Sequence, residues 1–320
     1  MTERSAPEAG QGRRQPHDRV ATRHTNVDFP IVALGASAGG LEAFKKFFDA
    51  MPAKCGMAFV LIQHLDPKHQ SLMVELLTSH TPMQVLQAAD GMRVERDHVY
   101  VIPPGAYLAI EGGVLKLSKP AERHGARMPF DFFLRSLAAA CGERAICAIL
   151  SGTGTDGSLG LKAVKEKGGL VIVQDPAEAA FDGMPRSAIN SGADLVLAVA
   201  AIPAALLRYS GQSYAKTAPM APGMTIAAPE GFAAIIALLA ATTTHDFTLY
   251  KQGTLQRRIE RRMAMGGLEN ATRYLEVLRD DAAERELLAK DLLINVTHFF
   301  RDPAVFDVLT ETVKIGRAHV

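Results

Sequence analysis

The sequence predicts an α/β protein, with a doubly wound, mostly parallel sheet followed by a small all-α domain. Three observations lead to this prediction. Short apolar runs alternate with helical segments from residue 29 to about residue 210, as expected for repeated strand–helix units. A stretch rich in Ser, Pro, Ala and Gly follows, and beyond it the apolar spacing is helical. Repeated strand–helix units build parallel sheets covered by helices on both faces.

Size and composition fit this organisation and exclude several classes of protein. The chain has 320 residues, 48% of them hydrophobic, and a formal net charge of +1, so its charge balance does not indicate nucleic-acid binding. Its three cysteines lack the spacing of a metal site, and we expect free thiols and no metal. No apolar run suits membrane insertion and no signal peptide begins the chain, so we expect a cytoplasmic protein.

Composition also divides the chain into segments. Residues 1–28 are polar and are predicted to form a disordered leader. The sheet domain is predicted over 29–210, a linker over 211–226 and the helical domain over 227–312. Residues 313–320 do not resemble the end of a domain, and we expect them to be the truncated start of a further one.

Within the sheet domain, apolar runs predict the strands 29–34, 58–62, 85–88, 145–150, 170–173 and 195–197. The helices between them are predicted at 41–49, 71–78, 130–140, 159–167 and 185–191. Turns containing Pro and Gly separate three further short runs, which predict a hairpin excursion from the main sheet, at 99–102, 107–110 and 114–117. The helical domain is predicted to contain helices at 229–241, 254–265, 271–278 and 282–295.

Three strand ends carry side chains that together suit nucleophilic catalysis. Ser37 lies in a glycine-rich turn after the first strand, His64 follows the second, and Asp156 follows the strand 145–150. The carboxyl ends of parallel strands lie at one edge of a sheet, so we expect these groups to meet. A serine hydroxyl needs an imidazole to accept its proton, and a carboxylate orients that imidazole. The sequence therefore predicts a serine hydrolase.

Each of these residues also has a structural alternative. Ser37 suits a turn or a helix cap, His64 a satisfied polar group, and Asp156 an N-cap for the helix at 159. A nucleotide-binding loop is a weaker alternative, because Ser37 replaces the second glycine of the dinucleotide fingerprint. The pattern Gly-x-Ser-x-Gly also fits the nucleophile elbow of α/β-hydrolases, but there the order along the chain is Ser, Asp, His. The order here indicates a different hydrolase fold.

The sheet domain resembles the CheB family of chemoreceptor methylesterases. The resemblance is carried by GASAGG at 35–40, IQH at 62–64, PFDFF at 129–133, SGTGTDG at 151–157 and GMPRSA at 183–188. It implies a protein-glutamate methylesterase, and many members also deamidate protein glutamines. It also implies that Ser37 is the nucleophile, His64 the base and Asp156 the orienting carboxylate, with Met184 lining the active site. Threonine often follows the nucleophile in this family, whereas Ala38 stands here, and we expect a less firmly held turn.

Further expectations follow from the resemblance. The substrates would be the cytoplasmic helices of methyl-accepting chemoreceptors, and a chemotaxis-type histidine kinase array is a further candidate partner. A helix start presents unpaired N–H groups that can hold an oxyanion, so we assign this role to Gly39, Gly40 and Leu41. No cofactor is expected for ester hydrolysis. The alternative function is a catalytically degenerate signalling module that binds receptors without turnover.

The helical domain resembles the N-terminal domain of the CheR family of glutamate methyltransferases. The resemblance is carried by DFTLYK at 246–251, RRIERRM at 257–263 and NVTHFFRD at 295–302. It implies that Thr297 and Arg301 contact S-adenosylmethionine in a full-length protein. It also implies that acidic receptor helices dock on Arg257, Arg258, Arg261 and Arg262, although such a run is more simply a solvated helix face. The chain thus resembles the front of a methylesterase–methyltransferase fusion, and we expect no methyl transfer from it.

Overall fold

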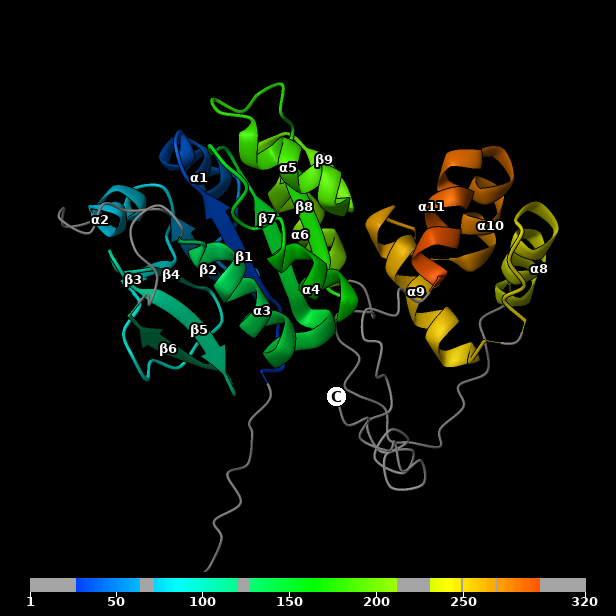
Figure 1. Cartoon of the computed structure of the whole chain (residues 1–320), viewed down its shortest axis with the longest axis horizontal. Helices are drawn as coiled ribbons and strands as arrows, with labels where there is room; N and C mark the ends of the chain where they lie inside the picture. The colour runs from blue at the N-terminus through cyan, green and yellow to red at the C-terminus, as the bar shows by residue number, and fades with distance from the viewer. Residues whose placement is uncertain are drawn as a thin grey trace, which may run out of the picture.

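The structure, a computed structural model, describes residues 27–63, 72–119, 127–211, 231–248, 250–268 and 270–293. Its main feature is a seven-stranded sheet in the order β3-β4-β2-β1-β7-β8-β9 (Figure 1). All pairings between neighbouring strands of this sheet are parallel. The strands are β1 (Ile31–Ala36), β2 (Ala58–Gln63), β3 (Gln84–Gln87), β4 (His98–Val101), β7 (Ala145–Ile149), β8 (Leu170–Gln174) and β9 (Leu195–Leu197). The predicted fold class is confirmed.

Helices cover both faces of the sheet, because side chains along a buried strand point alternately to either face. Val32 and Leu34 of β1 pack with α1 (Gly40–Asp49), α2 (Met73–Thr78) and α6 (Ile202–Gly211). Ile31 and Ala33 face the opposite layer. That layer contains the hairpin β5 (Tyr107–Glu111) and β6 (Val114–Ser118), with the helices α3 (Pro129–Cys141), α4 (Gly160–Glu166) and α5 (Gly183–Gly192). Two single 3₁₀ turns complete the domain, at Gly142–Arg144 and Val199–Ala201.

The strand order places a topological switch beside β1. From β1 the chain passes through α1 to β2 on one side, whereas from β7 it passes through α4 to β8 on the other side. The loops that leave the carboxyl ends of β1 and β7 therefore diverge and open a crevice between them. Ligands of open α/β sheets bind in such crevices.

Three details differ from the sequence predictions. The run at 99–102 belongs to the main sheet, as β4 between β3 and β2, so only β5 and β6 form the hairpin. The helix α6 was not predicted, and its apolar face packs on the core beside α1. Val27 is 8% exposed and Asp28 pairs with Arg96 at 3.0 Å. Val27 and Asp28, which the sequence assigned to the leader, therefore contact the sheet domain.

The helical domain consists of α8 (Phe232–Thr242), α9 (Gln252–Met265), α10 (Ala271–Asp280) and α11 (Ala282–Leu292). Their apolar faces form one core around Ile235, Phe247 and Tyr274. Side-chain caps begin the last two helices: the Asn270 carboxamide accepts from Thr272 N at 2.7 Å, and the Asp281 carboxylate accepts from Ala283 N at 2.8 Å. Such caps satisfy N–H groups that have no partner inside the helix.

Residues 1–26 of the predicted leader (1–28), most of the linker and the end of the chain lie outside the described residues. Among the helices that the structure describes, none has both the length and the apolar character needed to cross a membrane. The three thiols are free, as predicted. Burial raises the pKa of Cys55 to about 11 and that of Cys141 to about 12, so both stay protonated near neutral pH.

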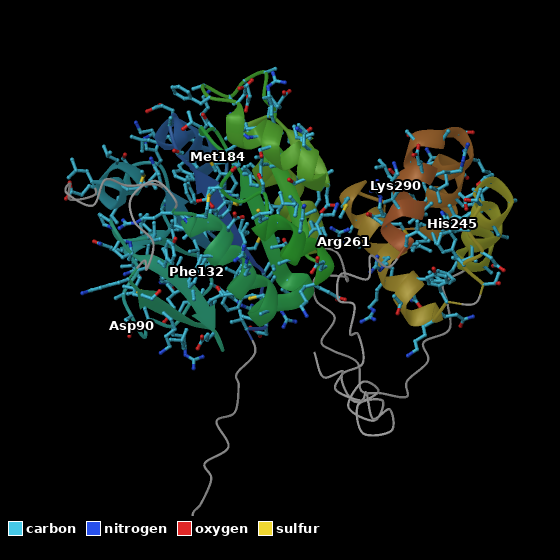
Figure 2. The ribbon with its side chains drawn as sticks, in the orientation of Figure 1. Asp90, Phe132, Met184, His245, Arg261 and Lys290 are labelled. Carbon is cyan, nitrogen blue, oxygen red and sulfur yellow. The ribbon has the colours of Figure 1, made fainter. Side chains whose placement is uncertain are left out.

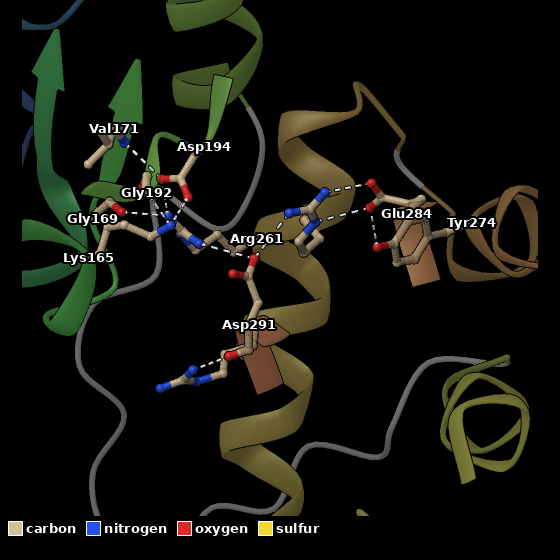
Figure 3. A network of polar contacts seen from close by, with 11 residues as sticks. Lys165, Gly169, Val171, Gly192, Asp194, Arg261, Tyr274, Glu284 and Asp291 are labelled. Atoms are coloured by element: carbon tan, nitrogen blue, oxygen red, sulfur yellow. Dashed lines mark hydrogen bonds and ion pairs between the residues drawn. The ribbon is translucent and has the colours of Figure 1, made fainter. Parts of the chain in front are cut away.

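The helix α9 lies against the sheet domain at the amino ends of its strands. Ala264 packs into the core that contains α6. Arg261 reaches the residues that precede β8 and β9: it donates to Gly169 O at 2.6 Å and pairs with Asp194 at 2.6 Å (Figure 3). Asp194 also receives Lys165 Nζ at 3.0 Å and Val171 N at 2.9 Å. Figure 2 places Arg261 between the two domains.

A second ion-paired group lies inside the helical domain. Arg262 donates to both carboxylate oxygens of Glu284, at 3.0 and 2.5 Å, and Tyr274 donates to the same carboxylate at 2.7 Å (Figure 3). Burial would lower the pKa of Arg262, but the hydrogen bonds and charge of Glu284 outweigh it and raise that pKa above its ordinary value. Asp291 lies within 3.6 Å of Arg261 and 3.3 Å of Arg262, and thereby joins the two groups.

These contacts correct the prediction that four arginines form one receptor-docking face. Arg261 and Arg262 are 6% and 8% exposed, and their charges are used within the chain. Arg258 is half-buried and donates to the Asp291 carbonyl. Arg257 is the most exposed of the four and lies 3.7 Å from Glu143. The i, i+4 spacing was right for the helix but did not reveal its acidic partners.

Candidate active site

The Ser37 turn joins β1 to α1 at the carboxyl edge of the sheet. Ser37 N donates to Ser151 O at 3.0 Å, and Gly40 N donates to Ser37 O at 3.0 Å. Gly39 has φ of +74°, which favours glycine. A Cβ on Gly39 would lie 2.7 Å from Ser151 Oγ and 2.9 Å from Ala180 Cβ. Only glycine fits here, and the tight turn places Ser37 at the beginning of α1.

Ser151 follows β7 and connects this turn to the loop before α5. Its hydroxyl donates to Ala38 O at 2.9 Å and accepts from Phe181 N at 3.0 Å. Its own N–H donates to Gln174 Oε1 at 2.7 Å. Ser151 is 1% exposed and Gln174 4%, so these bonds are shielded from water.

Asp156 is also held at this edge, in the loop after β7. Its carboxylate accepts from Phe130 N at 3.0 Å and from Asp131 N at 2.9 Å, at the start of α3. Asp131 in turn accepts from Leu159 N at 3.0 Å and Gly160 N at 2.6 Å, at the start of α4. The Asp156 carboxylate thus caps α3, and the Asp131 carboxylate of α3 caps α4. Asp156 therefore caps α3, and not the helix at 159 as the structural alternative held.

The start of α3 explains three of the glycines at this edge. A Cβ on Gly35 would lie 2.0 Å from the ring, and a Cβ on Gly157 would lie 2.7 Å from it. A Cβ on Gly160 would lie 3.0 Å from the Asp131 backbone. The start of α3 thus lies directly on the end of β1 and on the Asp156 loop, which keeps Asp156 beside the Ser37 strand.

Met184 lies at the start of α5 and is buried (Figure 2). Its N–H donates to Gly152 O at 2.9 Å, and a Cβ on Gly152 would lie 2.2 Å from Met184 Sδ and 3.0 Å from Ser37 Cβ. Met184 and Ser37 therefore flank Gly152 closely. An open pocket of about 510 Å³ adjoins them, lined by Thr153, Gly154, Ala179, Ala180, Phe181, Asp182 and Gly183.

Three of the predicted site residues, His64, Thr297 and Arg301, lie outside the described residues. The residue before His64 is described: Gln63 ends β2, pairs with Ala36 of β1, and directs its amide nitrogen to Ser37 O at 3.5 Å.

The predicted oxyanion donors are all at the start of α1, but one of them is already engaged. Gly40 N–H closes the turn on Ser37 O, so it is unavailable to a substrate, which corrects that part of the prediction. Gly39 lies at the N-cap position and Leu41 in the first turn of α1, where the helix dipole presents positive potential.

Sequence reasoning missed the parts played by Ser151, Gln174 and Asp131. Ser151 opens the SGTGTDG run, and a polar residue at the end of a buried strand was a usable signal. Asp131 lies in the PFDFF run, in the first turn of α3. Their partners lie 23 to 113 residues away, a separation that local patterns do not encode.

Comparison with protein families gives two matches. The family model described as CheB methylesterase matches residues 32–206. The model described as CheR methyltransferase, all-alpha domain, matches residues 230–293.

Similar proteins were found among curated sequences and solved structures. An "uncharacterized 104.1 kDa protein in hypE 3′ region" of Rhodobacter capsulatus is 39% identical over 75% of this chain and 27% of its own length. A protein-glutamate methylesterase/protein-glutamine glutaminase of Pseudomonas aeruginosa is 35% identical over 57% of this chain and 53% of its own length. The chain thus spans about half or less of these relatives. The crystal structure of the Thermotoga maritima CheB methylesterase catalytic domain matches with a TM-score of 0.53 at 31% identity, covering 57% of this chain and 98% of that one.

Proposed function

The chain belongs to the CheB methylesterase family, and we propose that it hydrolyses glutamate methyl esters on chemoreceptors. One observation carries the proposal: Ser37 lies in a tight glycine turn where the loops after β1 and β7 diverge, and the Asp156 loop lies beside it. This is the crevice in which an open α/β sheet accommodates a ligand. The relatives named protein-glutamate methylesterase support the choice of ester.

The chemistry follows from the acidity of each group. Ser37 Oγ attacks the ester carbonyl while His64 takes its proton, because an unaided hydroxyl is too weak an acid. Asp156 orients His64 and stabilises its protonated form. Protonated His64 returns the proton to the leaving oxygen, so methanol departs and a glutamyl ester of Ser37 remains. Water then attacks this ester while His64 takes its proton, and His64 returns that proton to Ser37 Oγ as it departs. The glutamic acid product ionises to its carboxylate, and Ser37 is free again.

The developing oxyanion needs donors that are fixed before reaction. We assign them to the N–H groups of Gly39 and Leu41 at the start of α1, because Gly40 N–H is bonded within the turn. The same acyl-enzyme accounts for glutamine deamidation, with ammonia leaving in place of methanol. Relatives carry the words protein-glutamine glutaminase in their names, which supports deamidation as a second activity. Neither reaction requires a cofactor or a metal.

We propose the cytoplasm as the place of action, since the signalling helices of receptors are exposed there, and a chemotaxis-type kinase array as a further partner. In a longer protein that carries a methyltransferase catalytic domain, Thr297 and Arg301 would contact S-adenosylmethionine. Among the four predicted docking arginines, Arg257 is the one we retain for receptor contact, because its side chain is 59% exposed.

The test is methanol release from a methylated receptor fragment. Ser37→Ala should lower the rate by about a thousandfold or more, since the nucleophile acts as a unit with its base, while the thermal unfolding curve should be unchanged. Near-normal release by this variant would exclude Ser37 as nucleophile. A wild-type protein that binds the receptor and releases no methanol would instead be a binding module without turnover.

A further inference from the structure

Ser151 is distinct from every residue to which the proposed reaction assigns a chemical step. It is 1% exposed, and its hydroxyl bonds the backbone on two sides. Resting on the proposed function, we propose that Ser151 is a positioning residue, whose hydroxyl sets the Ser37 turn and aims the Gly39 N–H at the oxyanion.

The hydrogen bonds of the Ser151 hydroxyl show which atom receives its proton. It carries one proton, which goes to Ala38 O at 2.9 Å, and it accepts from Phe181 N at 3.0 Å. Phe181 O, at 3.4 Å, already receives Gly152 N at 3.0 Å. Ala38 O is the nearer acceptor and accepts no other hydrogen bond from the described part of the chain, so the proton is held on the nucleophile turn.

Ser151 therefore makes hydrogen bonds to two consecutive residues of the nucleophile turn. Its carbonyl receives Ser37 N at 3.0 Å, and its hydroxyl fixes the carbonyl of Ala38, the next residue. A trans peptide is planar, with its C=O and N–H pointing in opposite directions. Because Ala38 C=O points to Ser151, the Gly39 N–H points away from Ser151, on the side proposed for the oxyanion.

Ser151 is itself held in place by hydrogen bonds to two other segments. Ser151 N donates to Gln174 Oε1 at 2.7 Å, and Gln174 ends the neighbouring strand β8. Phe181 N–H and C=O are both engaged at this point, which connects the turn to the wall of the open pocket. Groups held by buried hydrogen bonds keep a site near its productive geometry, where a displacement of about 1 Å can cost on the order of a hundredfold in rate.

The experiment compares Ser151→Ala with Ser136→Ala in the whole chain. Ser136 is a matched control: its hydroxyl also accepts from a backbone N–H, that of Ile110 at 3.1 Å, and donates to a carbonyl, that of Phe133 at 2.8 Å. It joins α3 to β5 and touches no residue of the turn. Both variants lose one bridging hydroxyl, and only Ser151→Ala should change catalysis.

We expect Ser151→Ala to lower kcat for methanol release by about tenfold to a hundredfold, with KM within about twofold of wild type, because positioning acts on the transition state. Ser136→Ala should match wild type in both constants. An unchanged kcat in Ser151→Ala, or an equal fall in both variants, overturns the proposal.

A second readout separates this proposal from the proposed function. An aryl or alkyl phosphonofluoridate labels an activated serine without needing a receptor, so the rate of Ser37 labelling is measured for each variant. Slower labelling of Ser151→Ala alone supports the positioning role even if wild type releases no methanol. Equal labelling in all three proteins contradicts it. Should Ser151→Ala fail to fold, Ser151→Cys takes its place, since a thiol fills the same space but is a weak donor.

Discussion

The carboxyl edge of the sheet ends in glycines, serine hydroxyls and capped helix starts, whereas the amino edge ends against charged side chains of α9. At the carboxyl edge, the Ser37 turn is held by uncharged hydrogen bonds from Ser151. At the amino edge, the Asp194 side chain is 1% exposed and receives both Lys165 and Arg261. One edge keeps a crevice open between its loops, and the other meets a helix of the second domain before β8 and β9.

The difference teaches how the two domains can share a chain without competing for the active site. Parallel strands place all their carboxyl ends at one edge, so a domain bound at the residues before β8 and β9 lies at the opposite edge from Ser37. The contacts of α9 thus hold the helical domain away from the crevice. In this arrangement α9 gives the helical domain a fixed place at the edge opposite the candidate active site.

The first prediction tests the carboxyl edge with a pair of glycines. Gly39→Ala should lower methanol release by about a hundredfold, because its Cβ would lie 2.7 Å from Ser151 Oγ and 2.9 Å from Ala180 Cβ, and such displacement of a nucleophile turn is costly. Gly56 near the amino edge is the control: its φ of +73° is nearly the same as that of Gly39, and no atom lies within 4 Å of its Cβ position.

Gly56→Ala should lose about 1–2 kcal/mol of unfolding free energy, the cost of placing an L-residue in the left-handed region. Gly39→Ala should lose at least as much, because its Cβ also overlaps Ser151 Oγ and Ala180 Cβ. Only Gly39→Ala should lose activity. Equal rates for the two variants would mean that close packing at Gly39 has no part in positioning Ser37.

Much of the carboxyl edge could be predicted from sequence, because its signals are local. An apolar run that meets a Gly-Ser turn predicts the placement of Ser37, and the run SGTGTDG predicts a loop with Asp156. Which helix Asp156 caps could not be predicted, since Phe130 and Asp131 lie 26 and 25 residues away. Local pattern gives the position of a polar group, and its partner depends on the tertiary fold.

The amino edge shows the same limit more strongly. Spacing along α9 predicted a basic face, but Arg261 finds Asp194 at a separation of 67 residues and Arg262 finds Glu284 at 22. Burying an arginine requires a carboxylate close by in space. The spacing along α9 did not indicate which distant carboxylates would approach it. The expectation of a loosely held Ser37 turn, drawn from Ala38, had the same origin. Ser151 supplies a hydrogen bond there from 113 residues away.

The second prediction tests the amino edge by neutralising Asp194. Asp194→Asn leaves Arg261 and Lys165 without their shared carboxylate, and the Arg261 side chain is only 8% exposed. Breaking a buried pair costs about 3–5 kcal/mol, so the unfolding free energy measured by urea titration should fall by an amount in that range. Asp28→Asn is the control, because the Asp28–Arg96 pair is 80% and 51% exposed, and its loss should cost about 0–1 kcal/mol.

Methanol release by Asp194→Asn should stay within about twofold of wild type under native conditions, since Asp194 lies at the edge opposite Ser37. A large fall in kcat for folded Asp194→Asn would show that the amino edge transmits its state to the active site, and the two edges would no longer be independent.

The smallest effect on stability is expected at Arg257. Its guanidinium lies 3.7 Å from Glu143, with side chains 59% and 36% exposed, so Arg257→Ala should change the unfolding free energy by about 0–1 kcal/mol. Water solvates both charges well in either state, which is why an exposed pair contributes little. Receptor binding is the sharper measurement, by titration of a receptor fragment at low and at physiological salt. If Arg257 meets acidic receptor helices, Arg257→Ala should weaken binding most at low salt, where charges are least screened. Lys290→Ala is the control, because it removes an exposed cation of α11 that pairs with Glu286 of the same helix. This variant should bind the receptor fragment as wild type does. Equal affinity of Arg257→Ala and wild type at both salt concentrations would remove the last of the four arginines from the docking role.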